Sequence, residues 1–353
     1  MKILHAADFH LDAPFAALSP EKAAIRRGEG REIPLRLAEL AREERVDLVL
    51  LAGDLFDGPT VRRETLSVLK EALGGIPAPV FIAPGNHDYY ASNTPYEGAW
   101  PENVTIFRTG QLVPYPLPRL GCVVYGAAFT GNSCLTDPLA GFSVPRDGNI
   151  HIAVLHGDVG QPCSRYAPIS EEHLAASGLT YCGLGHIHAP SGLRQAGETF
   201  WAYPGCPEGH GFDETGERGC LIVETGERTT ARFCTLAARS YVDISVEAGE
   251  DPLTAGRLAL AGQEEHCVRL TFTGETTRTL AGVEEKLAPL VFSLRVKDAT
   301  RPKTDREALR AGDTLTAAFF RVMEEKMEKG EPGAELALRF GLAALERGED
   351  CRP

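Results

Sequence analysis

The sequence lacks any uncharged apolar run approaching the roughly 18 residues that a membrane-spanning helix needs. It also lacks a signal-peptide pattern at its start, because Lys2 and His5 stand where an apolar segment would be required. Its nine cysteines are scattered, odd in number and never arranged as C-x-x-C, which indicates a reducing compartment and mostly buried thiols. We therefore expect a cytoplasmic protein that uses neither disulfides nor a membrane.

An excess of positive charge is missing as well, since the formal net charge is −13. A negative long-range field repels phosphates, so the surface as a whole is not expected to attract nucleic acid. A nucleic-acid substrate would need local compensation, which metal ions or the pairs Arg26–Arg27 and Arg62–Arg63 could supply. The same arginines are equally typical of a solvated helix face.

The length of 353 residues, with 43% apolar residues, suits a large catalytic domain with small additions. Short apolar runs that end in polar or glycine-rich turns are typical of buried strands. Helices are predicted at Ile33–Arg42, with proline near the start, and at Arg62–Leu73, before two glycines. This order predicts an α/β fold with helical crossovers. The predicted strands are Lys2–Ala7, Leu48–Ala52, Val80–Ala83, Cys122–Tyr125, Ile150–Leu155 and Tyr181–Leu184.

The pattern changes in the second half of the chain, where short extended segments alternate with glycine turns. A hairpin is predicted first, and a compact α/β unit and two helices follow it. We expect a main domain over residues 1–238, a small α/β domain over 239–300, and a linker with C-terminal helices over 301–353. The segments behind this division are strands at 220–224, 230–236, 241–246, 267–273 and 292–296, and helices at 251–263, 284–287, 309–327 and 334–346.

Potential metal ligands follow five of the predicted strands in the first half. Each short motif is weak alone, but ligands bind at the carboxyl ends of strands in open sheets, so a common position joins them into one site. The expected ligands are Asp8, His10, Asp54, Asn86, His156, His186 and His188.

The mixture of residue types predicts a centre of two divalent ions. Two such ions need a shared anionic ligand, and Asp54 is the natural bridge, with Gly53 allowing close backbone approach. Oxygen and imidazole ligands without thiolate favour manganese, with iron or zinc as alternatives. A hydroxide bridging the ions would be aligned to attack phosphorus.

His87 lies beside Asn86 in the same turn and is expected to reach the substrate rather than a metal. We predict that it is the general acid for the leaving oxygen. Asp57 either accepts a hydrogen bond from His87 and keeps it protonated, or caps a turn. Asp88 and Asp158 are expected to satisfy backbone groups or to orient a ligand histidine.

In this order, the residues resemble the calcineurin-like metallophosphoesterases, whose signature is D-x-H, G-D-x-x-D, G-N-H-D, H and G-H-x-H. The stretch Ala6–Phe15 and Tyr203–Gly205 resemble DNA-repair exonucleases of the SbcD and Mre11 type, in particular the YhaO branch. Many archaeal and eukaryotic relatives place histidine where Asp57 stands. In that branch the loop with His210 lies near the active site, which makes His210 a candidate for substrate contact, as are Arg62 and Arg63.

The resemblance implies a four-layer α/β/β/α sandwich, with 239–300 as a capping domain and the helices beyond 305 as an arm for an SMC-like coiled-coil ATPase. It implies one ion held by Asp8, His10, Asp54 and His188, and another held by Asp54, Asn86, His156 and His186.

We hypothesise a DNA nuclease, with 3′ to 5′ exonuclease and single-strand endonuclease activity, that acts as a homodimer with an ATPase partner. A phosphodiesterase for small molecules or cyclic nucleotides would use the same metals. An inactive scaffold for an ATPase and DNA is a third alternative, against which the complete ligand set and His87 argue.

Overall fold

The computed structural model describes residues 1–58, 60–226, 228–303 and 306–347. These residues form two compact units. The first holds the described residues of Met1–Ile244 together with Leu260–Arg269 and Ala288–Arg295. The second holds Ser245–Ala259, Leu270–Leu287 and the described residues from Val296 onward.

The first sheet has six strands in the order β12-β11-β1-β2-β3-β4. Strands β1 to β4 run parallel to one another, and β11 and β12 form the predicted hairpin, with β11 antiparallel to β1. Parallel strands buried on both faces read as continuous apolar runs, which is why β1 to β3 were predictable. The bounds are β1 Lys2–Ala6, β2 Leu48–Leu51, β3 Val80–Ile82, β4 Val104–Ile106, β11 Gly219–Glu224 and β12 Thr230–Thr235.

The second sheet also has six strands, in the order β5-β6-β7-β8-β10-β9. Its four central strands are parallel, and the two edge strands are antiparallel to their neighbours. The sequence predicted only three of these strands. The bounds are β5 Val113–Leu117, β6 Cys122–Gly126, β7 Ile150–His156, β8 Tyr181–Gly185, β9 Arg194–Ala196 and β10 Thr199–Ala202, with a short 3-10 helix at Pro118–Leu120.

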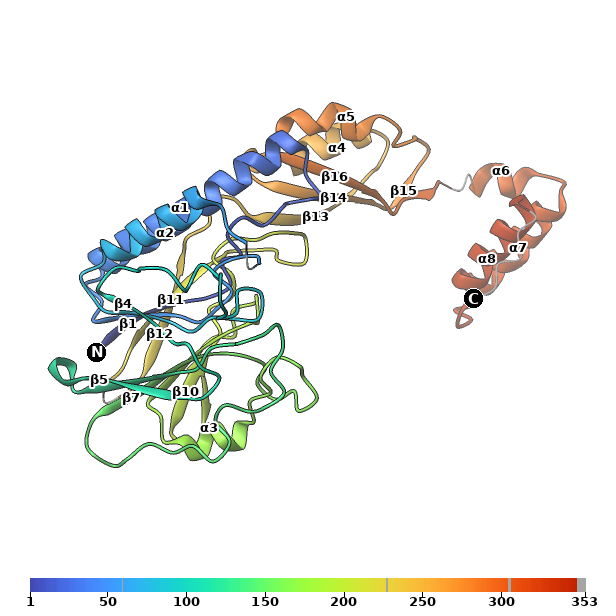
Figure 1. Ribbon diagram of the computed structural model, residues 1–353. Coiled ribbons are helices and arrows are strands. Elements are labelled where there is room, and N and C mark those ends of the chain that lie inside the picture. Colours follow the sequence, from blue (N-terminus) through green and yellow to red (C-terminus); the bar gives the residue numbers. More distant parts are fainter. Residues whose placement is uncertain (59, 227, 304–305, 348–353) are drawn as a thin grey trace. The chain divides into compact units, whose positions relative to one another are not determined.

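The two sheets pack face to face, and helices cover their outer faces (Figure 1). Apolar side chains such as Leu50 and Ile152 fill the core between the sheets. A second core lies under α1 (Pro20–Glu43) and α2 (Arg63–Gly74), and a third lies under α3 (Glu171–Ser177). The arrangement confirms the predicted four-layer sandwich.

Helix α1 begins 13 residues earlier than the predicted start at Ile33. Pro34, which suggested a helix start, lies inside the helix, and Ser19 and Pro20 supply the actual N-cap and first position. Tertiary contacts outweigh the poor helix propensity of this part of the chain. Arg26 is fully buried and pairs with Glu208 at 2.6 Å, so it neither compensates DNA charge nor belongs to a solvated face.

The segment after the hairpin alternates strands and helices as predicted. Strands β13, β14 and β16 form a sheet in that order, and β15 pairs with β17 in parallel. Arg301–Pro302, predicted as linker, is strand β17, while Thr304 of that linker lies outside the described residues. The bounds are β13 Tyr241–Glu247, α4 Pro252–Ala259, β14 Cys267–Thr273, β15 Glu275–Thr276, α5 Val283–Leu287, a 3-10 helix at Ala288–Leu290 and β16 Ser293–Asp298.

Three helices follow, α6 (Arg306–Ala311), α7 (Leu315–Glu328) and α8 (Ala334–Arg347). The predicted helix at 309–327 is therefore divided, because Thr314 caps α7 through its side chain. Phe320 and Met323 of α7 pack against Leu338 of α8.

None of the helices formed by the described residues is both long and apolar enough to cross a bilayer. The eight cysteines in this part of the chain are free thiols, and five of them are buried.

Candidate metal centre

The seven predicted ligands lie at or just after the ends of five strands, three in the first sheet and two in the second. Because parallel strands of a sheet point the same way, their carboxyl ends meet at one edge. The first sheet brings Asp8, His10, Asp54 and Asn86, and the second brings His156, His186 and His188.

One group of donors consists of Asp8, His10 and His188, whose ligand atoms lie within 4.8 Å of one another. The Nε2 atoms of His10 and His188 are 3.2 Å apart. The Asp8 carboxylate is fully buried and accepts a hydrogen bond at 3.0 Å from the backbone N–H of His186. One carboxylate and two imidazoles from different sheets thus face a common point.

The second group consists of Asp54, His156 and His186, within the same distance limit. Asp54 Oδ2 lies 3.4 Å from His156 Nε2 and 3.8 Å from His10 Nε2, so it touches both groups. Asn86 Oδ1 lies 3.0 Å from His156 Nε2. Asp54 therefore has the position expected of a ligand shared by two ions.

The ring nitrogens that do not face the centre have partners of their own. His156 Nδ1 lies 2.8 Å from the carbonyl oxygen of Ala52, and His10 Nδ1 lies 3.5 Å from Asp57 Oδ1. His188 Nδ1 is hydrogen-bonded to Glu214. A partner on one ring nitrogen sets the tautomer and directs the other nitrogen to the metal, as is usual for ligand histidines.

The charges in the centre fit a divalent cation. Burial alone would lower the pKa of His156, but the carboxylates of Asp54 and Asp8 outweigh it and raise the pKa to about 9. Burial and the neighbouring His156 lower the pKa of His186 to about 4. A field that holds a proton on one buried imidazole also attracts a metal ion, and the oxygen and nitrogen donors suit manganese, iron or zinc.

Glycines allow close approach at this point, between the two sheets at Gly53 and between neighbouring strand ends of the first sheet at Gly85. A Cβ on Gly53 would stand 2.5 Å from His156 Nδ1, and one on Gly85 would stand 2.2 Å from Asp54 Oδ1. Gly53 also has a φ of +86°, which side chains rarely adopt. The predicted role of Gly53 is therefore confirmed.

Several donors are themselves held in the left-handed backbone region. The φ angles are +56° at Asp8, +43° at His10, +51° at Asp54 and +106° at His186. Such conformations are uncommon for residues other than glycine and cluster at functional sites, where surrounding contacts enforce them. The turns after β1, β2 and β8 are thus shaped for the site.

His87 is exposed beside the donors, with its ring 4.8 Å from that of His10. Its backbone N–H donates to Asp54 Oδ1 at 2.9 Å. The predicted partner of its side chain needs correction, because Nδ1 lies 3.1 Å from the backbone carbonyl of Asp57 and not at the carboxylate. The carboxylate faces His10 instead, so Asp57 supports His87 through its main chain.

Two further acids support the donors as predicted. Asp88 is fully buried and accepts hydrogen bonds from the backbone of Asp54, Leu55 and Gly85. Asp158 Oδ2 lies 3.5 Å from His186 Nε2.

Two tyrosines that sequence reasoning did not assign complete this support. Tyr96 donates its hydroxyl proton to Asp88, and Tyr203 donates to the carbonyl of Gly157 at 2.6 Å, next to His156. No local motif distinguishes Tyr96 from any other core aromatic.

The predicted substrate-contacting residues lie at different places. His210 is close to the centre, with its ring 5.7 Å from that of His10 and stacked on Phe15. Arg62 donates its backbone N–H to Asp12 at the start of α2, and Arg63 is exposed at the first position of that helix. A role of all three in substrate binding stays a prediction.

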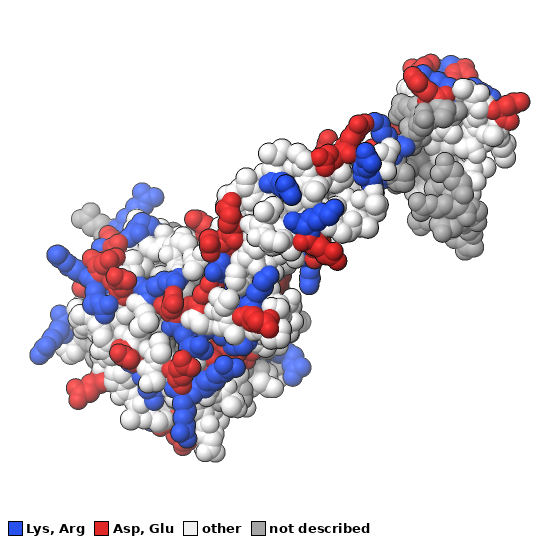
Figure 2. Space-filling view, turned by 90° about the horizontal axis from the view of Figure 1, so that it is seen from above, with Lys and Arg blue, Asp and Glu red and all other residues white. Residues whose placement is uncertain are grey.

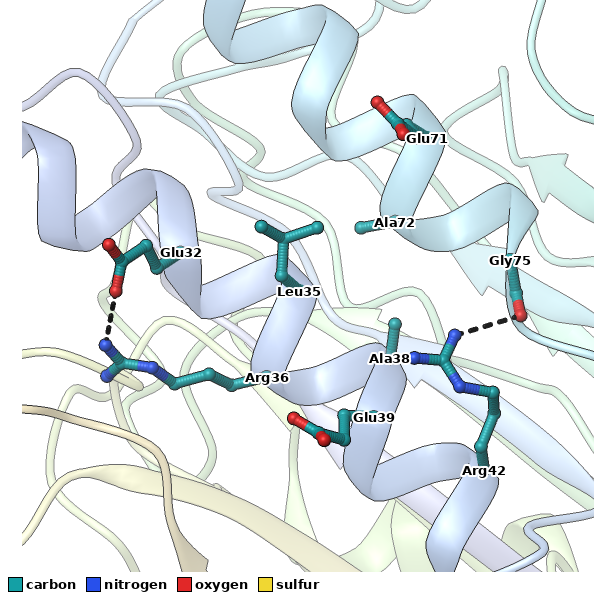
Figure 3. Close-up of a pocket in the computed structure, with 9 residues that line it drawn as sticks. All are labelled: Glu32, Leu35, Arg36, Ala38, Glu39, Arg42, Glu71, Ala72 and Gly75. Atoms are coloured by element: carbon teal, nitrogen blue, oxygen red, sulfur yellow. Dashed lines mark hydrogen bonds and ion pairs between the residues drawn. The ribbon is translucent and has the colours of Figure 1, made fainter.

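A surface groove lies between α1 and α2 (Figure 3). A helix that runs antiparallel to the strands it covers ends at the edge of the sheet opposite the carboxyl ends of those strands. The groove includes the C-terminal ends of both helices, at Arg42 and Gly75. None of the donors lines it. The lining residues are Glu32, Leu35, Arg36, Ala38, Glu39, Arg42, Glu71, Ala72 and Gly75.

The known proteins that resemble this chain include the following three relatives. The chain is 33% identical over 237 residues to the uncharacterized metallophosphoesterase YhaO of Bacillus subtilis (63% of this chain, 57% of that protein). It is 26% identical over 252 residues to the DNA double-strand break repair protein Mre11 of Methanopyrus kandleri (64% and 54%). It is 25% identical over 281 residues to a subunit of the SbcCD nuclease of Bacillus subtilis (65% and 68%). The chain spans little more than half the length of the first two.

The family model of the calcineurin-like phosphoesterases matches residues 1–190. This segment contains all seven donors and His87. Calcineurin-like phosphoesterases hydrolyse phosphoesters at a dimetal centre, in agreement with two donor groups that both lie near Asp54. Because the match covers more than half of the chain, this protein belongs to the calcineurin-like phosphoesterase family.

Proposed function

We propose that this protein is a metal-dependent DNA nuclease, with 3′ to 5′ exonuclease and single-strand endonuclease activity. The observation that carries the proposal is the arrangement of the centre, in which Asp54 touches both donor groups and the exposed His87 lies beside them. A phosphodiester needs charge neutralisation at phosphorus and a proton for its leaving oxygen, and these residues can provide for both.

The two donor groups would bind different metal ions. Asp8, His10 and His188 would hold one ion, and His156, His186 and Asn86 would hold the other, with Asp54 shared. Manganese is the proposed metal, with iron or zinc as alternatives. When bound, two such ions neutralise the phosphate oxygens and lower the pKa of the attacking water.

His87 would supply the proton. Hydrolysis joins a water oxygen to phosphorus and breaks the bond to the leaving oxygen, which must gain a proton as it departs. The Asp57 carbonyl contacts His87 Nδ1, so Nε2 is the ring nitrogen that would face a substrate. An imidazolium satisfied in this way can donate from Nε2 to the leaving oxygen.

DNA is the proposed substrate because two relatives are named as a DNA double-strand break repair protein and as part of a nuclease. Basic and acidic side chains are interspersed on the face that Figure 2 presents, so a long-range positive field is not what would bring DNA to the site. Recognition would instead depend on bound metals and on contacts near the centre, for which Arg62, Arg63 and His210 are the candidates.

The proposal extends to assembly. A relative is named as one subunit of a nuclease, and we propose an SMC-like coiled-coil ATPase partner and a homodimer for this chain too. Leu315 and Val322 of α7 and Leu336 of α8 are 74%, 54% and 52% exposed, and exposed apolar residues on a helix can bind a partner helix. Analytical ultracentrifugation of the chain, alone and mixed with a candidate ATPase, measures both associations.

The activity itself is tested with purified protein and Mn²⁺. Labelled single-stranded, hairpin and duplex DNA are incubated in parallel with bis-p-nitrophenyl phosphate and cyclic nucleotides. We expect metal-dependent cleavage of DNA that disappears with a chelator and falls sharply in His87→Gln. His173→Gln is the matched control, because His173 is a half-exposed histidine of α3 that pairs with Asp137 away from the donors.

The outcomes separate the alternatives. Cleavage of cyclic nucleotides or of the small diester with intact DNA would replace the nuclease by a small-molecule phosphodiesterase. Failure to hydrolyse any ester, with two ions bound, would favour an inactive scaffold.

A further inference from the structure

Glu214 is a buried acid in the loop between β10 and β11, only 7% exposed. A carboxylate without water needs hydrogen-bond donors, and both oxygens of Glu214 have them. Oε1 contacts His188 Nδ1. Oε2 accepts the backbone N–H of His210 at 2.6 Å and lies 3.1 Å from His210 Nδ1. One side chain is thus hydrogen-bonded to two histidines of the same region.

The contact with His188 determines which ring nitrogen can bind a metal. A carboxylate accepts hydrogen bonds and does not donate them, so the proton of a neutral His188 ring belongs on Nδ1. The lone pair of Nε2 then points toward His10 Nε2, 3.2 Å away. The main chain of His188 is held separately, because its carbonyl accepts hydrogen bonds from Arg218 and from the N–H of Cys206.

The contact with His210 places a second histidine ring beside the same donor group. His210 stacks on Phe15 with ring centres 5.4 Å apart and meets the ring of His10 edge-on at 5.7 Å. Because Glu214 holds both the backbone and the ring of His210, it positions that ring against His10 as well.

We propose that Glu214 is a positioning residue that fixes His188 in its metal-binding tautomer and holds His210 beside the same donor group. The proposal rests on the metal centre of the proposed function. It concerns one ion only, because His156 in the other group is oriented by the backbone carbonyl of Ala52 and does not depend on Glu214.

The decisive variant is Glu214→Gln, which keeps the size of the side chain. An amide has one acceptor and one donor end, whereas His188 and His210 both present donors. If the amide oxygen faces His188, the amide NH₂ opposes the N–H of His210. If the amide oxygen faces His210, the amide NH₂ faces His188 and requires the proton of His188 to move to Nε2. We expect binding of one Mn²⁺ to weaken by about 10- to 100-fold, as is typical when the partner of a ligand histidine is lost.

Isothermal titration with Mn²⁺ alone measures this without reference to activity. The wild type should bind two ions, and Glu214→Gln should keep one at wild-type affinity. Glu208→Gln is the matched control, because Glu208 is a buried acid of the same loop that pairs with Arg26. It should keep both ions even if its unfolding temperature falls. His210→Ala should change Mn²⁺ affinity only a few-fold, because it leaves the contact between Glu214 and His188.

Nitrogen NMR of wild-type protein labelled at histidine tests the same point without any variant. His188 should carry its proton on Nδ1, and a proton on Nε2 would overturn the proposal. So would two ions of unchanged affinity in Glu214→Gln, or an equal loss in His210→Ala. A wild type that binds none of Mn²⁺, Fe²⁺ and Zn²⁺ would instead refute the metal centre itself, and the proposed function with it.

Discussion

The two donor groups differ in what orients their histidines. His156 ends β7 at 2% exposure, and its Nδ1 is held by the backbone carbonyl of Ala52 from the other sheet. His188 follows β8, is partly exposed, and is held by the Glu214 side chain from a loop. His156 is therefore oriented by the packing of the two sheets, whereas His188 is oriented by a side chain from a loop.

This difference bears on how a substrate reaches the metal centre. A centre closed on all sides would exclude a polymer, whereas a centre made only of loops would not hold its ligands within the small tolerance that metal sites require. Here the buried His156 and Asp54 give rigidity, and His87, His188 and His210 lie on the accessible side.

Asp54→Ala should have the largest effect, because Asp54 is shared by both donor groups. We expect loss of both ions and a fall in kcat/KM of about 10³-fold or more, which corresponds to several kcal/mol of transition-state stabilisation. Elemental analysis and steady-state kinetics measure the two effects. Asp147→Ala, which removes an exposed acid paired with His151, is the control. Retention of two ions would show that the groups are independent.

His87→Gln should separate chemistry from metal binding. We expect turnover to fall by about 10²- to 10⁴-fold, the range for loss of a general acid, with metal content unchanged. Asp57→Asn sharpens the result, since it keeps the carbonyl that contacts His87 and alters only the carboxylate near His10. A loss in Asp57→Asn equal to that in His87→Gln, with metal content unchanged, would mean that the carboxylate, not the carbonyl, supports the proton donor.

Gly185→Ala tests the packing of the two sheets that orients His156. A Cβ at Gly185 would stand 1.8 Å from the carbonyl oxygen of Ala52 and 2.9 Å from His156 Nδ1, so the sheets would have to separate. We expect a loss of about 1–3 kcal/mol in the free energy of unfolding, measured with urea, which is the usual cost of overpacking. Gly131→Ala is the control, because nothing lies within 4 Å of its added Cβ. Equal stabilities would show that the sheets yield more easily than the contact implies.

Tyr203→Phe should have the smallest effect. Its hydroxyl donates to the carbonyl of Gly157 and accepts the N–H of Val159 at 3.0 Å, so its loss leaves one buried and one half-buried backbone group with one partner fewer. We expect about 1 kcal/mol of destabilisation in urea unfolding, with both ions still bound. Loss of an ion would place the turn after His156 among the parts that decide metal affinity.

Much of the fold was predictable because its central strands are continuous apolar runs. Lys2–Ala6 and Leu48–Leu51 are buried on both sides, which requires apolar residues at nearly every position. The start of α1 was not predictable in this way, because Pro34 and the glycines before it are poor helix formers that burial of Arg26 and Ile33 overrides. The edge strand Val113–Leu117 is largely exposed and carries two prolines, so it has no apolar pattern to detect.

The sequence by itself determined the donor types and their placement after strands, because strand ends in a parallel sheet share one edge. Only the tertiary structure decided how those donors are held. Glu214 is 26 residues from His188 in sequence, and the Asp57 carbonyl rather than its carboxylate contacts His87. Such contacts depend on loop conformation and on packing between two sheets, which distant residues determine jointly and which no local pattern of residue types records.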